Sequence, residues 1–178
     1  MGHRLAQAAL AMIAIEAFAG RSIDQIAFVV EDLEPALARY SALLPAGEWR
    51  VLTFGSKDHE RCEYRGRPAE FSCRVALNDQ SPQLELIQPL TGASTYHDWL
   101  DEHREGPHHV GIVVDSVADA VAQAAGAGFE VVQSGSGIGR YRDGAWAYID
   151  TSAALGLMVE PIELTTELPP TEFTWPRE

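Results

Sequence analysis

The sequence predicts an α+β protein in which two βαβββ modules pack together into one cupped, eight-stranded mixed sheet. The stretches at residues 23–44 and 108–132 resemble each other, and each reads as a β-branched strand followed by an amphipathic helix. Further short apolar runs, separated by turn residues, follow each helix and predict the remaining strands. Because a single module leaves one face of its sheet uncovered, we expect the two modules to bury those faces against each other.

The helix of each repeat is predicted by apolar residues that recur at i, i+4, i+7 and i+11, which places them on one helix face. In chain order these residues are Leu33, Leu37, Tyr40 and Leu44 in the first repeat and Val117, Val121, Ala124 and Gly128 in the second. The first repeat carries about nine more residues than the second, and an extra hairpin near residues 57–66 would account for them.

These elements divide the chain into five parts. Residues 1–20 are an Ala-rich N-terminal arm, residues 21–90 are the first module, and residues 91–106 are a linker with a short helix. Residues 107–164 are the second module, and residues 165–178 are a Pro-rich tail that we expect to lie extended on the surface.

The N-terminal arm has two interpretations. Basic residues before an apolar stretch, followed by the small-residue motif Ala-Phe-Ala, resemble a secretory signal peptide. Gln7 and Glu16 are poor residues for the apolar core of such a peptide, and the stretch is too short to span a bilayer. We therefore expect a retained helix that packs on the domain or on a second subunit.

Composition and charge narrow the class of function. The chain has 178 residues, of which 46% are hydrophobic and 22% are charged, as is typical of a globular domain. Its 26 acidic residues outnumber 13 Lys plus Arg, and the resulting net charge of −13 argues against nucleic acid and anionic membranes as partners. Cys62 and Cys73 fit neither a zinc motif nor a disulfide framework, which favours a reducing, cytoplasmic location.

Four polar residues interrupt otherwise apolar strands at matching places in the two repeats: Gln25, Glu85, His109 and Glu160. A carboxylate on the buried face of a sheet costs free energy unless it is paired or binds a metal. Two carboxylates, one imidazole and one amide oxygen therefore predict a site for one divalent ion per chain, with Mn, Co, Ni, Mg, Fe(II) and Zn all suitable. The alternative is that the two glutamates face solvent on alternating strands.

The chain resembles the vicinal oxygen chelate superfamily, which includes glyoxalase I, methylmalonyl-CoA epimerase, extradiol dioxygenases and bleomycin-resistance proteins. The resemblance covers about residues 22–163, and the stretch LELIQPLTGASTYHDWLDEHREGPHHVGIVV at residues 84–114 is most similar to methylmalonyl-CoA epimerase. It implies the glyoxalase-like fold, with Gln25, Glu85, His109 and Glu160 as the metal ligands. The epimerases usually have His where this chain has Gln25, whereas some glyoxalase I enzymes share the present set.

The resemblance implies a metal-dependent isomerase or lyase that removes a proton next to a chelated carbonyl of a small acyl or carbonyl substrate. Glu160 would be the first base, and Glu70 is the candidate for a second acid, with Glu63 as another. Extradiol dioxygenases need two histidines and one carboxylate as iron ligands. This chain has only His109 among its candidate ligands, which argues against that branch of the superfamily. The other class of function is a non-catalytic protein that sequesters a small molecule in the same fold. A homodimer is expected in either case.

Three further residues are candidates for contacts with the substrate. Arg74 lies mid-strand with the parity that we assign to the concave face, within a cluster of basic residues between positions 50 and 74. Tyr141 and Arg142 lie in a Gly-rich stretch that would be either a mobile lid or a plain hairpin loop. His108, next to His109, should point to the opposite face of its strand.

Overall fold

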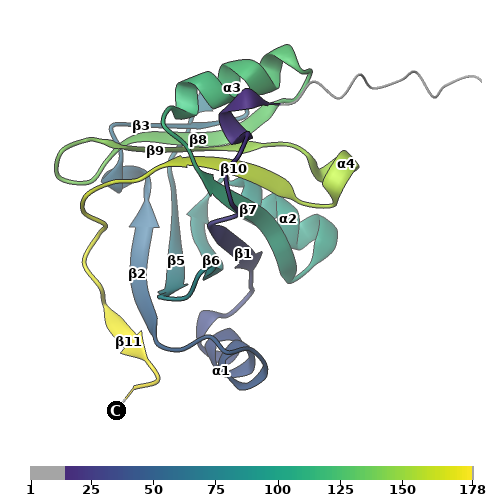
Figure 1. Cartoon of the computed structure of the whole chain (residues 1–178). Helices are drawn as coiled ribbons and strands as arrows, with labels where there is room; N and C mark the ends of the chain where they lie inside the picture. The colour runs from purple at the N-terminus through teal and green to yellow at the C-terminus, as the bar shows by residue number, and fades with distance from the viewer. Residues whose placement is uncertain (1–14, 178) are drawn as a thin grey trace, which may run out of the picture.

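The computed structural model describes residues 15–177, and most of the expected N-terminal arm lies outside them. Eleven strands form one mixed sheet in the order β11-β2-β5-β6-β1-β7-β10-β9-β8-β3-β4. Figure 1 shows the strands of the first half running steeply across those of the second half, so that the sheet folds over on itself. The predicted fold class is confirmed.

Each module contributes a strand, a helix and three more strands, as the repeat predicts. The first comprises β1 (Gln25–Val29), α1 (Leu33–Leu43), β2 (Trp49–Gly55), β5 (Phe71–Asn78) and β6 (Gln83–Gly92). The second comprises β7 (Gly106–Val113), α3 (Val117–Gly126), β8 (Val131–Ile138), β9 (Gly144–Ile149) and β10 (Met158–Glu163). These two sets supply the expected eight strands.

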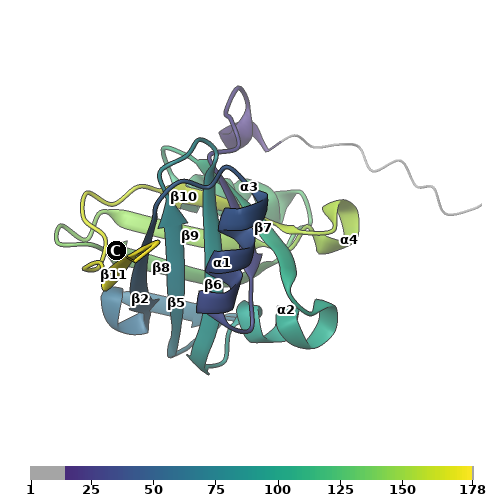
Figure 2. The same cartoon turned by 90° about the horizontal axis from the view of Figure 1, so that it is seen from below.

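The three remaining strands are short and extend the two edges of the sheet. They are β3 (Arg61–Tyr64), β4 (Arg67–Pro68) and β11 (Phe173–Trp175). The hairpin of β3 and β4 contains the extra residues of the first repeat, and β3 pairs with β8 of the second module. In the tail, β11 pairs with β2, as Figure 2 also shows. The two modules are therefore joined at the β3–β8 edge as well as at the centre.

Four helical segments complete the described chain. They are the 3-10 turns η1 (Glu16–Phe18) and η2 (Ser56–Asp58), the linker helix α2 (Thr95–His103) and the short α4 (Ser152–Leu155). Thr95–His103 is the short helix that the sequence predicts between the modules. No helix within residues 15–177 is long and apolar enough to cross a membrane.

Successive residues along each strand point alternately to the inner and the outer face of the sheet. On β5, Cys73, Val75 and Leu77 point into an inner apolar cluster that both modules share. Ala76 points the other way, into a cluster against α1, while α3 covers a third cluster on the second module. Both faces of β5 are therefore buried, which a simple pattern of alternating apolar and polar residues does not reveal.

The two modules meet where β1 pairs antiparallel with β7. In this pairing Ala27 lies opposite His109 on β7, and on its other side Ala27 lies opposite Glu85 on β6. Gly111 in turn lies between Gln25 on β1 and Glu160 on β10. The central strands therefore carry all four interrupting polar residues within two neighbouring rows of the sheet.

Candidate active site

The four polar residues come together around one atom, the Nε2 of His109. This nitrogen lies 3.0 Å from Glu160 Oε2, 3.3 Å from Gln25 Oε1 and 3.5 Å from Glu85 Oε2. The side chain of His109 is fully buried, and those of Glu85 and Glu160 are 13% and 8% exposed. The structure thus gathers side chains from four strands and both modules at one buried point.

The amide of Gln25 has a fixed orientation in this cluster. Its Nε2 donates a hydrogen bond to Gln83 Oε1 at 2.9 Å, which turns the carbonyl oxygen toward His109. An oxygen, and not an NH2 group, is therefore presented to the centre of the cluster. Carbonyl oxygens are suitable ligands for hard divalent cations.

Gly111 leaves room for this arrangement. A Cβ atom at this position would lie 2.9 Å from Gln25 Cβ and 2.8 Å from Ile162 Cδ1. Real Cβ atoms essentially never come so close to other atoms, so a side chain here would displace Gln25 or Ile162. The glycine at the centre of a strand is thus explained by the close approach of β1 and β10 side chains.

We expect Gly111→Ala to lower the free energy of unfolding by about 1–3 kcal/mol, the usual range for overpacking a buried site. Chemical denaturation measures the change. Gly126→Ala is the matched control, because a Cβ there meets no atom within 4 Å and Ala is the better residue in a helix. Equal stability of Gly111→Ala and the parent protein would contradict the crowding described above.

Burial controls the charge of the cluster. It raises the pKa of Glu160 to about 8, against a hydrogen bond from Tyr148 that lowers it. Burial and the nearby Glu160 raise the pKa of Glu85 well above its usual range. Burial also lowers the pKa of His109 to about 3, so the imidazole is neutral. Without a cation, the cluster therefore favours neutral, protonated carboxyls.

These pKa shifts predict that the metal-free protein loses stability as the pH rises. In the folded state Glu160 keeps its proton up to about pH 8, whereas in the unfolded chain the carboxyl loses it near its ordinary pKa of 4.5. Folding therefore takes up a proton between these values, and the free energy of unfolding falls by up to about 1.4 kcal/mol per pH unit for such a group. Thermal unfolding in chelator between pH 6 and 8 measures this. A melting temperature that rises across this range would contradict it.

The donor set fits a divalent cation. Ligands at right angles on an ion with bonds of about 2.1 Å lie about 3.0 Å apart, close to the contacts from His109 Nε2 to the three oxygens. One imidazole nitrogen and three oxygens suit the harder divalent ions. In the part of the chain that the structure describes, no three His, Cys, Asp or Glu side chains are already spaced around a common centre as metal ligands. Small side-chain rotations would be needed to admit an ion between these contacts.

The cluster lies at the wall of a cavity of about 330 Å³ between the two halves of the sheet, and Gln25, Glu85 and Glu160 line it. Most of the other lining residues are apolar or aromatic, and among them are Leu52, Phe54, Val75, Leu77, Tyr96, Ile138, Trp146, Tyr148 and Ile162. The polar Asp24, Gln83 and Glu163 also line the cavity. Leu164, at the end of the second module, and Thr165 and Leu168 of the tail complete the lining. A cavity with apolar walls and a small group of converging polar atoms is typical of a site for a small molecule.

The structure does not bring the other predicted site residues to this cavity. Arg74 was expected on the concave face, but it lies on the opposite face of β5, where its guanidinium lies 3.7 Å from Glu172 and over the ring of Phe173. The expected parity was wrong because Cys73 and its apolar neighbours two residues apart occupy the inner face. Glu70 is exposed just before β5, outside the cavity wall.

The remaining three candidates also lie elsewhere. Tyr141 is 67% exposed in the turn between β8 and β9, and Arg142 lies 3.6 Å from Glu60 and lines a separate, shallow cleft. Glu63, on β3, is paired with Arg61 on the outer side. A second acid for the cavity is therefore not supplied by Glu70 or Glu63.

Two tyrosines in the wall were missed by sequence analysis. The hydroxyls of Tyr96 on α2 and Tyr148 on β9 lie 2.9 Å apart, and Tyr148 also contacts Glu160. The signal for Tyr148 was its strand alternation with Trp146, which lines the same cavity. Tyr96 carried no such signal, because the linker helix could not be placed against the sheet from its sequence.

Comparisons with known proteins agree with this architecture. A model of the family described as the Glyoxalase/Bleomycin resistance protein/Dioxygenase superfamily matches residues 24–148. A methylmalonyl-CoA epimerase from Mycobacterium tuberculosis is similar in structure, with 19% identity and a TM-score of 0.54 over 80% of this chain and 87% of that one. No curated protein sequence matches the chain.

Two other solved structures are similar to the same degree. A hypothetical protein from Bacillus halodurans shows 17% identity and a TM-score of 0.56, covering 85% of this chain and 99% of that one. A Streptomyces coelicolor methylmalonyl-CoA epimerase variant in complex with 2-nitronate-propionyl-CoA shows 19% identity and a TM-score of 0.52, covering 79% and 94%. At such identities these similarities establish the fold, and the reaction must be argued from the site.

Proposed function

The chain belongs to the glyoxalase/bleomycin resistance/dioxygenase superfamily, and on this premise we propose that it is a metal-dependent isomerase or lyase that removes a proton next to a carbonyl group. The observation that carries the proposal is the convergence of Gln25, Glu85 and Glu160 on His109 at the wall of an apolar cavity. One divalent ion per chain, held by these four side chains, would polarise the carbonyl oxygen of the substrate.

Glu160 is the proposed base. Its carboxyl lines the cavity, and a bound divalent ion would favour the ionised form that can act as a general base. In its carboxylate form it takes the proton from the carbon next to the carbonyl and holds it at an Oε atom. Tyr148 contacts this carboxyl and limits its orientation.

The walls support a particular course for the proton. Of the described residues, β2 and β5 present only Leu52, Phe54, Val75 and Leu77 to the cavity, and none of these can carry a proton. Epimerisation by two bases on opposite faces of the substrate would need an acid or base there. The site therefore favours glyoxalase-like chemistry, in which one base both removes and returns the proton, over epimerase-like chemistry.

The residues that line the cavity also indicate which class of substrate it would bind. Among the described residues that line the cavity there is no Lys or Arg, whereas aromatic and aliphatic side chains are abundant. A small acyl or carbonyl compound with an apolar body and a pair of oxygens for the ion fits this lining. The homodimer and the cytoplasmic location expected from the sequence remain predictions beside this proposal.

Solvent-deuterium exchange tests the proposed reaction before any product is known. Protein loaded with Mn²⁺, Co²⁺ or Ni²⁺ is incubated in D2O with a panel of 2-methyl acyl thioesters and 2-hydroxy carbonyl compounds. We expect deuterium at the carbon next to the carbonyl in at least one panel member, and none when chelator is added. Exchange that persists in chelator would contradict the role of the ion.

A non-catalytic binding protein is the second candidate function. It is favoured by the same pKa shifts, because protonated Glu85 and Glu160 beside a neutral His109 make a site that is uncharged without any ion. The fluorescence of Trp146, whose side chain lines the cavity, reports on ligand entry. Tight binding of an apolar compound in chelator, with no exchange in the whole panel, would decide for this alternative.

A further inference from the structure

His108, the neighbour of His109, is fully buried and surrounded by aromatic rings. The ring centroids of Tyr148, Trp99 and Tyr96 lie 5.1, 5.2 and 5.3 Å from its own. Its Nδ1 lies 2.9 Å from the Nδ1 of His109. Adjacent residues in a regular strand point to opposite faces, so this contact needs a local explanation.

A β-bulge supplies the explanation. In the pairing of β1 with β7, Ala27 lies opposite His109 and Phe28 lies opposite Pro107, so His108 has no partner on β1. An extra residue of this kind bends its strand and redirects a side chain. The bulge therefore brings the rings of two consecutive histidines into hydrogen-bonding contact, and the expectation that His108 would point away from the site is wrong.

Only one of the two facing nitrogens can carry a proton, since a hydrogen bond needs one donor and one lone pair. If His109 carries its proton on Nδ1, it donates to His108 Nδ1, and His109 Nε2 presents a lone pair to Gln25, Glu85 and Glu160. A nitrogen that binds a metal must have this lone pair. In the opposite arrangement, His109 Nε2 carries the proton and cannot bind a cation.

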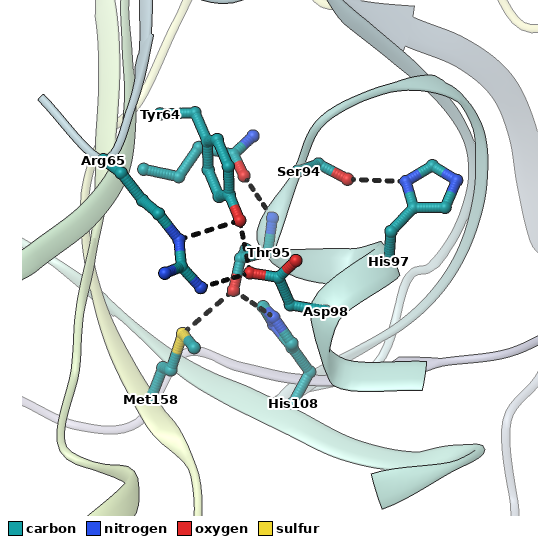
Figure 3. A network of polar contacts seen from close by, with 9 residues as sticks. Tyr64, Arg65, Ser94, Thr95, His97, Asp98, His108 and Met158 are labelled. Carbon is teal, nitrogen blue, oxygen red and sulfur yellow. Dashed lines mark hydrogen bonds and ion pairs between the residues drawn. The ribbon is translucent and has the colours of Figure 1, made fainter. Parts of the chain in front are cut away.

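The surroundings of His108 suit the first arrangement. With its Nδ1 accepting, a neutral His108 carries its proton on Nε2, which lies 3.4 Å from the hydroxyl oxygen of Thr95. The Thr95 hydroxyl can then donate to the sulfur of Met158 at 3.5 Å, so each donor has an acceptor. Figure 3 shows His108 and Met158 on either side of the Thr95 hydroxyl.

Thr95 itself is held in place by other elements. Its backbone N–H donates to Gln133 Oε1 at 2.8 Å, which ties the first residue of α2 to β8. One turn later in α2, Asp98 accepts hydrogen bonds from Tyr64 and from Arg65 on the β3–β4 hairpin (Figure 3). Residues of β8 and of the β3–β4 hairpin therefore hold the start of α2, and with it Thr95, beside His108.

We propose that His108 is a positioning residue: it accepts the Nδ1 proton of His109 and so keeps the Nε2 lone pair of His109 directed at the metal. The inference rests on the proposed metal role of His109, and it assigns His108 no contact with substrate. Partners of this kind typically change metal affinity by roughly 10–100-fold.

Long-range ¹H–¹⁵N NMR on histidine-labelled protein tests the inference without a substitution. In the Zn²⁺-loaded protein we expect the proton of His109 on Nδ1 and that of His108 on Nε2. A Zn²⁺-loaded protein with the proton of His108 on Nδ1 would overturn the inference. If the parent protein binds no stoichiometric Zn²⁺, Co²⁺ or Ni²⁺, the metal premise of the proposed function fails as well.

Two variants add a readout in metal affinity. His108→Leu removes the acceptor, and we expect the Kd for Zn²⁺ to rise by roughly 10–100-fold. His108→Asn can place an amide oxygen near the position of Nδ1, and we expect it to bind within a few-fold of the parent. Equal affinity of the Leu variant and the parent, in proteins with matching circular dichroism, would contradict the inference. The parent protein could also bind metal normally and show the expected tautomers, yet catalyse no deuterium exchange. That result would contradict the proposed reaction and leave the role of His108 intact.

Discussion

Glu160→Gln is expected to lower solvent-deuterium exchange by roughly 10²–10⁴-fold, the range for loss of a positioned general base. The amide keeps an oxygen that faces His109, so the variant can still hold an ion at this position. A neutral amide is a very weak base, however, so the variant lacks the group that takes the proton. The rate of deuterium incorporation into an active panel compound, at equal metal content, measures the effect.

Glu163→Gln is the matched control for this experiment. Glu163 also lines the cavity, but its carboxyl accepts a hydrogen bond from the backbone N–H of Val117 and takes no part in the cluster around His109. The control should exchange at nearly the parental rate. Exchange that survives Glu160→Gln at full metal occupancy would show that another group is the base, and Glu85 or Tyr148 in the same wall would be the next to test.

His109→Ala is expected to abolish stoichiometric metal binding. Its Nε2 is the only nitrogen among the four converging groups, and it lies within 3.5 Å of all three oxygens. Its removal takes away the central donor and leaves two buried carboxyls that favour their protonated forms. We expect the Kd to rise by more than about 100-fold, the upper end for loss of a residue that only orients a ligand. Titration with Co²⁺ or Ni²⁺, followed by calorimetry, measures this.

His97→Ala serves as the control for the loss of a histidine. His97 lies on α2, half-buried, with its Nδ1 3.1 Å from the hydroxyl of Ser94, and it does not line the cavity. This variant should bind one ion as the parent does. If His109→Ala binds metal as tightly as the control, the ion is held elsewhere and the proposed ligand set is wrong.

The convergence of the four polar residues could be predicted because it depends on symmetry. Each residue interrupts an apolar strand at the same place in its repeat, and the pairing of β1 with β7 brings the two repeats together at their first strands. A polar side chain on the buried face of a strand also needs a polar partner, since leaving it unpaired costs free energy. Several such side chains are therefore expected to meet at one site. The repeat in the sequence was therefore sufficient to predict that Gln25, Glu85, His109 and Glu160 converge.

The substrate contacts could not be predicted in the same way. Arg74 alternates correctly along β5, but β5 is buried on both faces, and alternation alone does not tell which face is concave. Tyr141 and Arg142 lie in a turn whose direction depends on tertiary contacts, here an ion pair of Arg142 with Glu60. Tyr96 reaches the cavity from α2, and its position depends on how that helix packs on the sheet. The expected arm at residues 1–20 lies mainly outside the described residues.

The bulge at His108 shows a further limit of strand patterns. Period-two alternation assigns neighbouring residues to opposite faces, and one unpaired residue in β7 is enough to break this rule. Gly106 and Pro107 directly precede His108, but such a pair is equally compatible with the ordinary start of a regular strand. The position of the bulge became apparent only from the register against β1.

Anomalous diffraction from crystals grown with Co²⁺, and without chelator, would locate the proposed ion itself. We expect one strong anomalous peak per chain, about 2.1 Å from His109 Nε2 and at similar distances from oxygens of Gln25, Glu85 and Glu160. A cavity without a peak in protein shown to be folded, or a single peak bound by other residues, would contradict it.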